Sequence, residues 1–351
     1  MNSVIDLNMR KAGLRFQISS SGVRGHSIPY RPELDGVRGV AILAVLLNHI
    51  GAISHGGWGV DVFFLLSGYL ISTILLTNAA NGQMAKKFYL RRFARLAPLS
   101  IFYVFFGLIS VTIVRSKYSL FEMFSALFYF RNFFPFSASP WSHYWSLSAE
   151  EQFYFLWPIA LALTLKMRKL SALALFSIST FIVLQLSQLF FTFKNSVGYF
   201  VFEHVVIRPS TILLGCGIAL IEKKLSSTQK LQLNYSLFLC GISLIAIGLT
   251  FQNLAWSLGI VLLFSSLLIP QTGKLRFFAT ALSFNPLTRI GLLSYSIYIW
   301  QFCVIKMVNL ASTHCLVLKA PLTLAFSLMI GFISFNYFEK PCQNILISKF
   351  I

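Results

Sequence analysis

Apolar residues in this chain occur in long runs, separated by short stretches that hold most of the charged residues. A helix needs about 20 mainly apolar residues to cross the hydrocarbon core of a bilayer, so runs of this length predict membrane-spanning helices. The pattern therefore predicts an all-α, polytopic integral membrane protein with about ten transmembrane helices. The expected spans are residues 36–54, 58–79, 97–114, 148–165, 171–192, 205–221, 234–251, 254–270, 290–310 and 319–337.

The Lys and Arg residues between these segments predict an orientation. They are concentrated in every second loop, for example in the stretch that contains Arg91, Arg92 and Arg95. Loops rich in Lys and Arg stay in the cytoplasm, so we expect both termini there. The expected organisation is a basic cytoplasmic tail over residues 1–29, one membrane domain over residues 30–341 and a short cytoplasmic tail over residues 342–351.

The composition agrees with a membrane protein and argues against two other classes. Hydrophobic residues make up 56% of the chain and charged residues 11%, against about a quarter in soluble proteins. The net charge of +19 follows the loops between apolar segments, as orientation signals do, so we expect no nucleic-acid partner and expect the lipid bilayer as surroundings. The five cysteines show no metal-ligand spacing, and we expect no metal.

One connection, residues 115–147, is far longer than the others and is rich in Phe, Tyr and Trp. Long loops without secondary structure are uncommon in compact domains, so we expect interfacial or re-entrant helices in it. The loop is a candidate lid or cavity wall. For most of its Phe residues, we favour an aromatic belt at the lipid headgroups.

The first predicted span carries two polar residues that need a reason. Arg38 and His49 lie eleven residues apart, which is about three helical turns, so both side chains point to one face, roughly 16 Å apart along the axis. Polar groups at membrane depth usually face a bundle interior or a watery cavity. His49 is therefore a candidate general base and Arg38 a candidate anion-binding residue. The alternative is an Arg that reaches the interface and a hydrogen-bonded core His.

Two further pairs are candidates for the same site. Arg92 and Arg95 lie three residues apart before the third span, so both face the same way. Paired guanidiniums suit phosphate groups. The alternative is that they signal topology or bind lipid headgroups, which explains most cations next to a membrane. Glu150 and Glu151 lie near the expected outer start of the fourth span. One of them is a candidate partner of His49, and the alternative is a helix-start role with Ser146 or Ser148 as the cap.

Six sequence blocks, in order, resemble the membrane acyltransferase family 3. They are LDGVRGVAILAVLLNHI, GVDVFFLLSGYLI, FYLRRFARLAP, HYWSLSAEEQFYFLWP, GLLSYSIYIWQF and NYFEKP. The resemblance implies an enzyme of the cytoplasmic (inner) membrane that moves an acyl group, usually acetyl, from cytoplasmic acyl-CoA to a hydroxyl of an extracytoplasmic carbohydrate. It also implies that Arg38, His49, Arg92 and Arg95 match essential motifs of the family and that Glu150 and Glu151 match its acidic pair.

On this resemblance, Arg38, Arg92 and Arg95 are expected to hold the phosphates of the acyl-CoA (acetyl-CoA) co-substrate. His49 is expected to deprotonate the acceptor or to carry the acyl group briefly, with Glu150 or Glu151 orienting it. The chain departs from many relatives at Gln301, where they have His after Trp. A polytopic transporter or flippase is the alternative function, and an inactive membrane subunit is a third. The acceptor and the oligomeric state, including a homo-oligomer, are left open.

Overall fold

The computed structural model describes residues 29–80, 86–113, 119–135, 139–188, 197–250, 253–270, 275–311 and 316–350. These residues form helices and connecting loops and contain no strand. The expected N-terminal tail therefore lies, apart from its last residue, outside the described residues. The first elements are α2 (Pro32–His49), α3 (Trp58–Ala80), α4 (Lys86–Ile113), α5 (Leu120–Leu127), the 3-10 turn η1 (Arg131–Phe133), α6 (Tyr144–Lys166), α7 (Leu170–Ser187), α8 (Val197–Phe202) and the π-helical turn η2 (Glu203–Ile207). They are followed by α9 (Ser210–Glu222), α10 (Ser227–Thr250), α11 (Asn253–Leu268), α12 (Arg276–Leu282), α13 (Asn285–Leu292), α14 (Ser294–Ala311), α15 (Leu316–Ser334), the π-helical turn η4 (Phe335–Glu339) and α16 (Lys340–Phe350).

All ten predicted segments are largely helical, but fewer qualify as membrane spans. Among the described residues, six helices are long and apolar enough to cross a membrane, or seven if the pair α13 and α14, bent by 71°, is counted as one span. The helices α2 and α6 carry charged residues within their apolar runs, and α11 has only 16 residues. The chain is therefore an all-helical, multi-pass membrane protein, with three predicted spans that are too polar or too short for that criterion.

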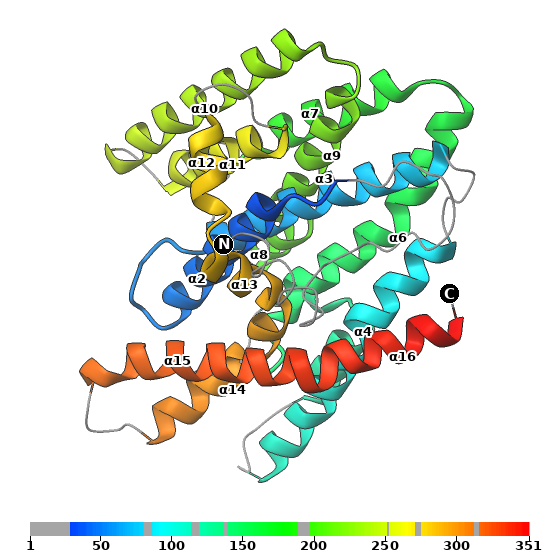
Figure 1. Ribbon diagram of the computed structural model, residues 1–351. Coiled ribbons are helices and arrows are strands. Elements are labelled where there is room, and N and C mark those ends of the chain that lie inside the picture. The colour runs from blue at the N-terminus through cyan, green and yellow to red at the C-terminus, as the bar shows by residue number, and fades with distance from the viewer. Residues whose placement is uncertain are drawn as a thin grey trace, which may run out of the picture.

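Helix α2 lies in the middle of the molecule, with α3 on one side and α13 on the other (Figure 1). The contact with α13 depends on glycines. A Cβ atom on Gly291 of α13 would lie 1.8 Å from the carbonyl oxygen of Asp35, and one on Gly39 of α2 would lie 2.3 Å from that of Leu287 on α13. The two backbones therefore pack directly on each other, and this contact fixes the position of α2.

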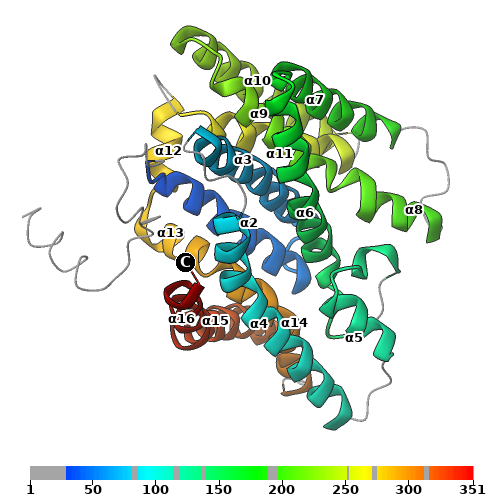
Figure 2. The same cartoon turned by 90° about the vertical axis from the view of Figure 1, so that its right-hand side faces the viewer.

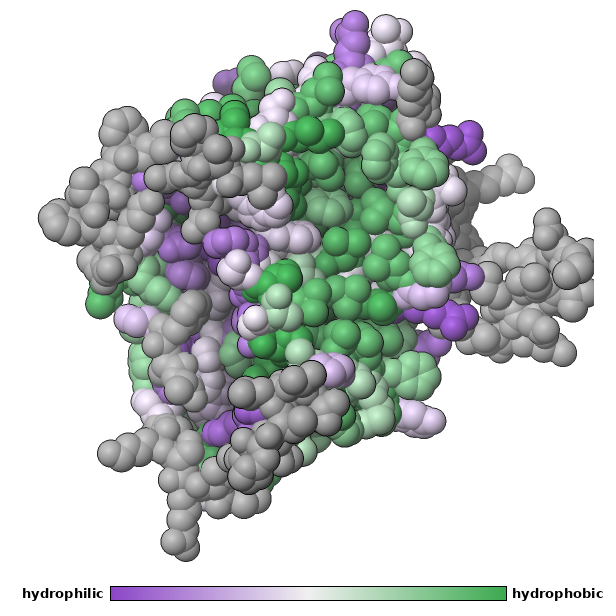
Figure 3. Space-filling model, turned by 90° about the vertical axis from the view of Figure 1, so that its left-hand side faces the viewer, coloured by the Kyte–Doolittle hydropathy of each residue, from purple (hydrophilic) through white to green (hydrophobic). Residues whose placement is uncertain are grey.

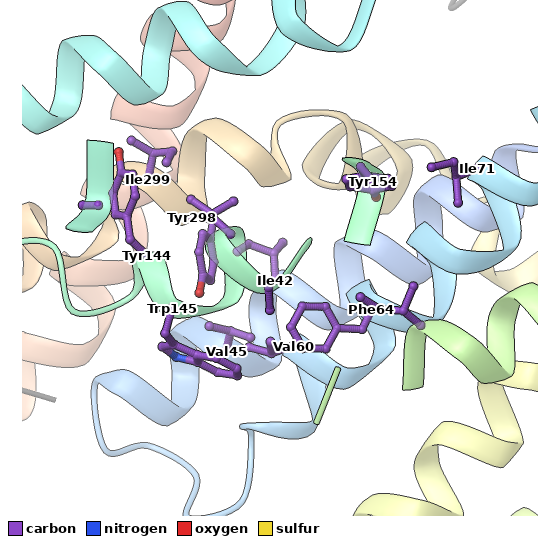
Figure 4. Close-up of a cluster of buried hydrophobic side chains, with 14 of the residues drawn as sticks. Ile42, Val45, Val60, Phe64, Ile71, Tyr144, Trp145, Tyr154, Tyr298 and Ile299 are labelled. Carbon is purple, nitrogen blue, oxygen red and sulfur yellow. The ribbon is translucent and has the colours of Figure 1, made fainter. Parts of the chain in front are cut away.

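The other helices flank α2 in two groups. Helices α3, α7, α9, α10 and α11 pack together on one side, and α4, α14, α15 and α16 on the other, as two orthogonal views show (Figures 1 and 2). Buried side chains at the centre join the two groups, and Figure 4 shows Tyr298 of α14 and Trp145 of α6 among Ile42 and Val45 of α2. The site described below lies along this junction.

The surface agrees with a membrane environment. Figure 3 shows a broad hydrophobic area on one face, bordered by hydrophilic side chains. Large hydrophobic side chains are also exposed elsewhere, for example Leu175, Phe176 and Val183 on α7. In water such an area would favour association, whereas lipid covers it without cost.

Several helix boundaries differ from the predicted ones, and α4 begins at Lys86 rather than at residue 97. The predicted tenth span ends at residue 337, whereas the helix continues through η4 into α16 and ends at Phe350. The long aromatic connection contains the expected short helices, α5 and η1, among its described residues. Helix α6 begins at Tyr144, four residues before the expected start, which places Glu150 and Glu151 in its second turn rather than its first.

Candidate active site

Helix α2 is continuous from Pro32 to His49, so the expected geometry of Arg38 and His49 holds. Eleven residues at 1.5 Å each separate their backbones by about 16 Å. We call the end with Arg38 the arginine end and the end with His49 the histidine end. His49 is the last residue of the helix, whereas the prediction placed it inside a span that continued to residue 54. Its exposed imidazole therefore lies at a helix terminus.

The helix ends here because Gly51 adopts a left-handed conformation with φ of 74°. The amide of Gly51 donates to the carbonyl of Asn48 (3.1 Å) and that of Ala52 donates to Leu47 (2.9 Å). This is the Schellman arrangement, which terminates helices most readily at glycine. The stop signal is present in the sequence as Gly51, but the apolar pattern alone did not reveal it.

The partner of His49 is Gln301 of α14. Its Oε1 atom lies 3.1 Å from Nδ1 of His49, across 252 residues of sequence. A side-chain carbonyl oxygen only accepts hydrogen bonds, so Nδ1 carries the proton in this arrangement and Nε2 keeps its lone pair. The residue at which the chain departs from many relatives thus sets the tautomer of the candidate base.

Aromatic rings extend this end of the site. Phe302 packs against His49 with ring centroids 4.8 Å apart and stacks on His143 at 4.9 Å. His143 is 2% exposed, and its carbonyl oxygen accepts a hydrogen bond from Tyr298 (3.0 Å). The beginning of α6 is therefore held next to His49.

Glu150 and Glu151 do not contact His49. Both guanidinium nitrogens Nε and Nη2 of Arg92 donate to Oε1 of Glu151, at 3.1 and 2.8 Å. The Arg92 guanidinium also lies over the ring of Tyr154, at 3.0 Å from its centroid. Glu151 thus fixes Arg92 on α4 against α6.

Glu150 accepts hydrogen bonds from the hydroxyls of Ser67 and Tyr154, the latter at 3.1 Å. Other side chains thus engage both carboxylates, and the expectation that one of them orients His49 stays a prediction, whereas the helix-start alternative is wrong. His143 occupies the N-cap position of α6, and Ser148 instead accepts from the backbone amide of Arg131 at 3.1 Å. The reason is the earlier start of α6, which moves both carboxylates inward to the level of Arg92.

The three predicted arginines gather at the arginine end. Arg38 donates to Oδ1 of Asp35 at 3.1 Å. Arg95 interacts electrostatically with Arg38, Arg92, Asp35 and Glu339. The site thus combines three guanidiniums with nearby carboxylates in a mostly buried setting, where charges need partners.

Sequence reasoning did not assign a role to Glu339. It is 2% exposed, and Ser296 donates to its Oε2 atom at 2.7 Å. It ends the π-helical turn η4, and such turns are frequent at functional sites. An acidic residue next to an apolar segment was the available signal. Among the described residues, we find no group of His, Cys, Asp and Glu suited to a metal ion.

Comparison with known proteins identifies the family of the chain. A family model described as "Acyltransferase domain" matches residues 31–337. The O-acetyltransferase OatA of Staphylococcus aureus (strain NCTC 8325 / PS 47) is 31% identical over 323 residues, covering 81% of this chain and 52% of the relative. The Peptidoglycan O-acetyltransferase OatA of Listeria monocytogenes is 31% identical over 358 residues, covering 91% of this chain and 57% of the relative.

The chain thus spans about half the length of these curated relatives. No solved structure matches it. The family match covers α2 with both its ends, the arginine pair on α4, the acidic pair on α6 and Gln301 on α14. The chain belongs to the acyltransferase domain family.

Proposed function

We propose that the protein is a membrane-embedded O-acyltransferase that moves an acyl group, most simply acetyl, from acyl-CoA to a carbohydrate hydroxyl. The observation that carries the proposal is the layout of α2, which joins a cluster of three arginines to an exposed histidine about 16 Å away. An extended donor with phosphates at one end and a thioester at the other suits that layout. The family match and the names of the relatives support the same chemistry.

The arginine end is the proposed binding site for the CoA phosphates. Arg92 uses Nε and Nη2 on one carboxylate oxygen, so its remaining N–H groups can donate to a phosphate. Arg38 and Arg95 add two further guanidiniums nearby. In this proposal Glu150 and Glu151 do not act on His49. They hold Arg92 and Tyr154 in place and balance the charge of the clustered arginines.

The histidine end is the proposed site of acyl transfer. Nε2 of His49 takes the proton of the acceptor hydroxyl, whose oxygen attacks the thioester carbonyl. The carbon–sulfur bond then breaks, and the CoA thiolate receives the proton. In the alternative order, Nε2 attacks the thioester first, releases CoA and passes the acyl group to the hydroxyl. Gln301 holds the resting proton of the imidazole on Nδ1, so Nε2 begins both orders with a free lone pair.

The acceptor is proposed to be an extracytoplasmic glycan. One of the relatives is named a peptidoglycan O-acetyltransferase, and O-antigen, exopolysaccharide and oligosaccharide acceptors carry the same hydroxyl chemistry. The proposed setting is the cytoplasmic membrane, with ten spans, both termini in the cytoplasm, and residues 30–341 as the catalytic unit. In this topology, the arginine end faces the cytoplasmic donor and the histidine end faces the outer acceptor.

The test is transfer by the purified protein in liposomes. With [14C]acetyl-CoA and a panel of soluble glycans, we expect labelled O-acetyl groups on a glycan and release of free CoA in equal amounts. A transporter would instead move label or glycan across the bilayer without forming an ester. Failure to acetylate any glycan, together with glycan uptake into the liposomes, would favour the transporter.

A further inference from the structure

A cavity of about 360 Å³ lies at the histidine end of α2. Its volume is within the range of small-molecule binding pockets. The wall includes Asn48, the neighbour of His49 on α2, and Trp58 and Asp61 from the start of α3. The other side is formed by α7, η2 and α11, and includes Gln188, Glu203, Arg208 and Trp256. None of these residues serves the donor site described above.

We propose that this cavity binds a sugar unit of the carbohydrate acceptor and presents its hydroxyl to His49. The inference rests on the proposed O-acyl transfer and names the place of the acceptor in it. Asn48 lines the cavity and directly precedes His49, the last residue of α2, so the wall lies one residue from the histidine. Because His49 is exposed at the very end of α2, a glycan seated in the cavity reaches it across the helix terminus.

The charges of the cavity suit a neutral ligand. Arg208 donates to both oxygens of Asp61, at 3.0 and 3.1 Å, and to the carbonyl of Gly57 at 2.7 Å. The guanidinium is therefore engaged by a carboxylate, and the second acid, Glu203, leaves no excess of positive charge. A phosphate group would find its one permanent cation, Arg208, already paired with a carboxylate, with the titratable His55 as the other basic residue of the wall, whereas a sugar requires no cation.

The polar groups are those that recognise hydroxyls. Asn48 accepts from the amide of Gly56 at 3.0 Å through Oδ1, which leaves its NH₂ group to donate. Gln188 donates to Gln185 at 2.7 Å, which leaves its own carbonyl oxygen to accept. Nε1 of Trp256 is buried and has no hydrogen-bond partner among the described residues. A buried donor without a partner needs an explanation, and a sugar hydroxyl provides one.

A π-helical turn forms part of the cavity wall. Glu203 and Ile207, which both line it, are the first and last residues of the π-helical turn η2. A π-helical turn re-aims side chains within a helix and is frequent at functional sites. Arg208 then links the cavity to the transfer site, because its guanidinium lies 5.1 Å from the ring centroid of Trp145, two residues after His143.

The test uses Gln188→Ala and Trp256→Phe in the full chain, with Gln343→Ala on α16 as the matched amide control. The probes are N-acetylglucosamine oligosaccharides and solubilised peptidoglycan fragments, with binding measured by calorimetry and transfer measured with [14C]acetyl-CoA. We expect each cavity variant to weaken oligosaccharide binding and raise the acceptor KM by about fivefold, the effect of one lost hydrogen bond. The acetyl-CoA KM, kcat and the control should stay unchanged.

An unchanged acceptor KM and affinity in both variants, with wild-type transfer intact, would overturn the cavity assignment alone. Glycan binding that depends on Gln188 and Trp256 without any transfer would instead keep the cavity and contradict the proposed function. Wild-type protein that binds glycerophosphate headgroups but none of the oligosaccharides would also overturn the assignment, since it would make the cavity a lipid site. Trp256→Phe keeps a large aromatic ring and should fold. It therefore still tests the cavity assignment if Gln188→Ala alone fails to fold.

Discussion

Gln301 accepts a hydrogen bond from Nδ1 of His49 at 3.1 Å and so determines which nitrogen of the imidazole can act as a base. Gln301 is fully buried and belongs to α14, whereas His49 ends α2. The tautomer therefore depends on how these two helices pack. The partner of His49 is thus a neutral amide, which orients the imidazole without titrating.

Replacing Gln301 by Leu should lower kcat while leaving both KM values nearly unchanged. The loss of one hydrogen bond of about 1 kcal/mol corresponds to roughly a fivefold lower rate, because both tautomers and other ring orientations become populated. Gln301→His should retain more activity than Gln301→Leu, since an imidazole nitrogen can also accept from Nδ1. The measurement is the pH profile of kcat for the three proteins. Equal profiles for Gln301→Leu and wild type would remove Gln301 from the mechanism.

The pair of Arg92 and Glu151 should behave as a coupled unit in stability. Removing one partner leaves the other charge poorly solvated, which costs about 3 kcal/mol for a buried pair, and less here because both side chains remain about one-fifth exposed. The double variant Arg92→Ala/Glu151→Ala should therefore lose less than the sum of the single variants. Unfolding in detergent, analysed as a double-mutant cycle, measures this coupling. Additive losses would mean that the two side chains do not support each other.

Donor binding should depend on the three clustered arginines and not on a neighbouring one. Arg38→Ala, Arg92→Ala and Arg95→Ala should each weaken acetyl-CoA binding by roughly tenfold or more, the size expected for a charge-assisted hydrogen bond. Arg91→Ala is the control, because Arg91 carries the same charge on the same helix but is not among the charged groups that act on Arg95. Equilibrium binding of labelled acetyl-CoA provides the measurement. If all four variants lose affinity equally, the effect is general attraction by a basic surface.

The contact between α2 and α13 should tolerate no side chain at Gly291. In Gly291→Ala the new methyl group meets the backbone oxygen of Asp35, so helix α2 must shift, at a cost of about 1–3 kcal/mol. Because Asp35 holds Arg38, acetyl-CoA binding should weaken as well. Gly57→Ala is the matched control, since the nearest atom to its new methyl group lies 3.7 Å away. Thermal unfolding compares the two variants, and equal stability would argue against the close packing.

Much of the fold could be predicted, because apolar runs determine where helices form. All ten segments are largely helical. Helix α2 is continuous because no proline interrupts the stretch between Pro32 and His49. Helix ends were less predictable. Gly51 stops α2 through local hydrogen bonds, and α6 begins at Tyr144 within a stretch that the pattern assigned to a loop. Hydrophobicity does not report such local capping.

The site was only partly predictable, because its contacts join helices that are distant in sequence. The resemblance predicted that Arg38, Arg92 and Arg95 belong together, and the structure places them in one cluster. Periodicity on one helix could not reveal that Glu151 pairs with Arg92, 59 residues earlier, or that Gln301 pairs with His49. Loop charges placed Arg92 toward the cytoplasmic side and Glu151 toward the outer side of the membrane. The two side chains instead form a hydrogen bond, so they lie at the same level of the bundle.

The measurement that tests the account most directly is acetyl transfer by His49→Ala in liposomes, with acetyl-CoA binding determined on the same sample. We predict that transfer to the glycan falls by at least about a hundredfold, the lower range of a general-base contribution, while acetyl-CoA affinity and the unfolding temperature match wild type. Transfer at the wild-type rate by a variant that binds acetyl-CoA normally would contradict the central role of His49.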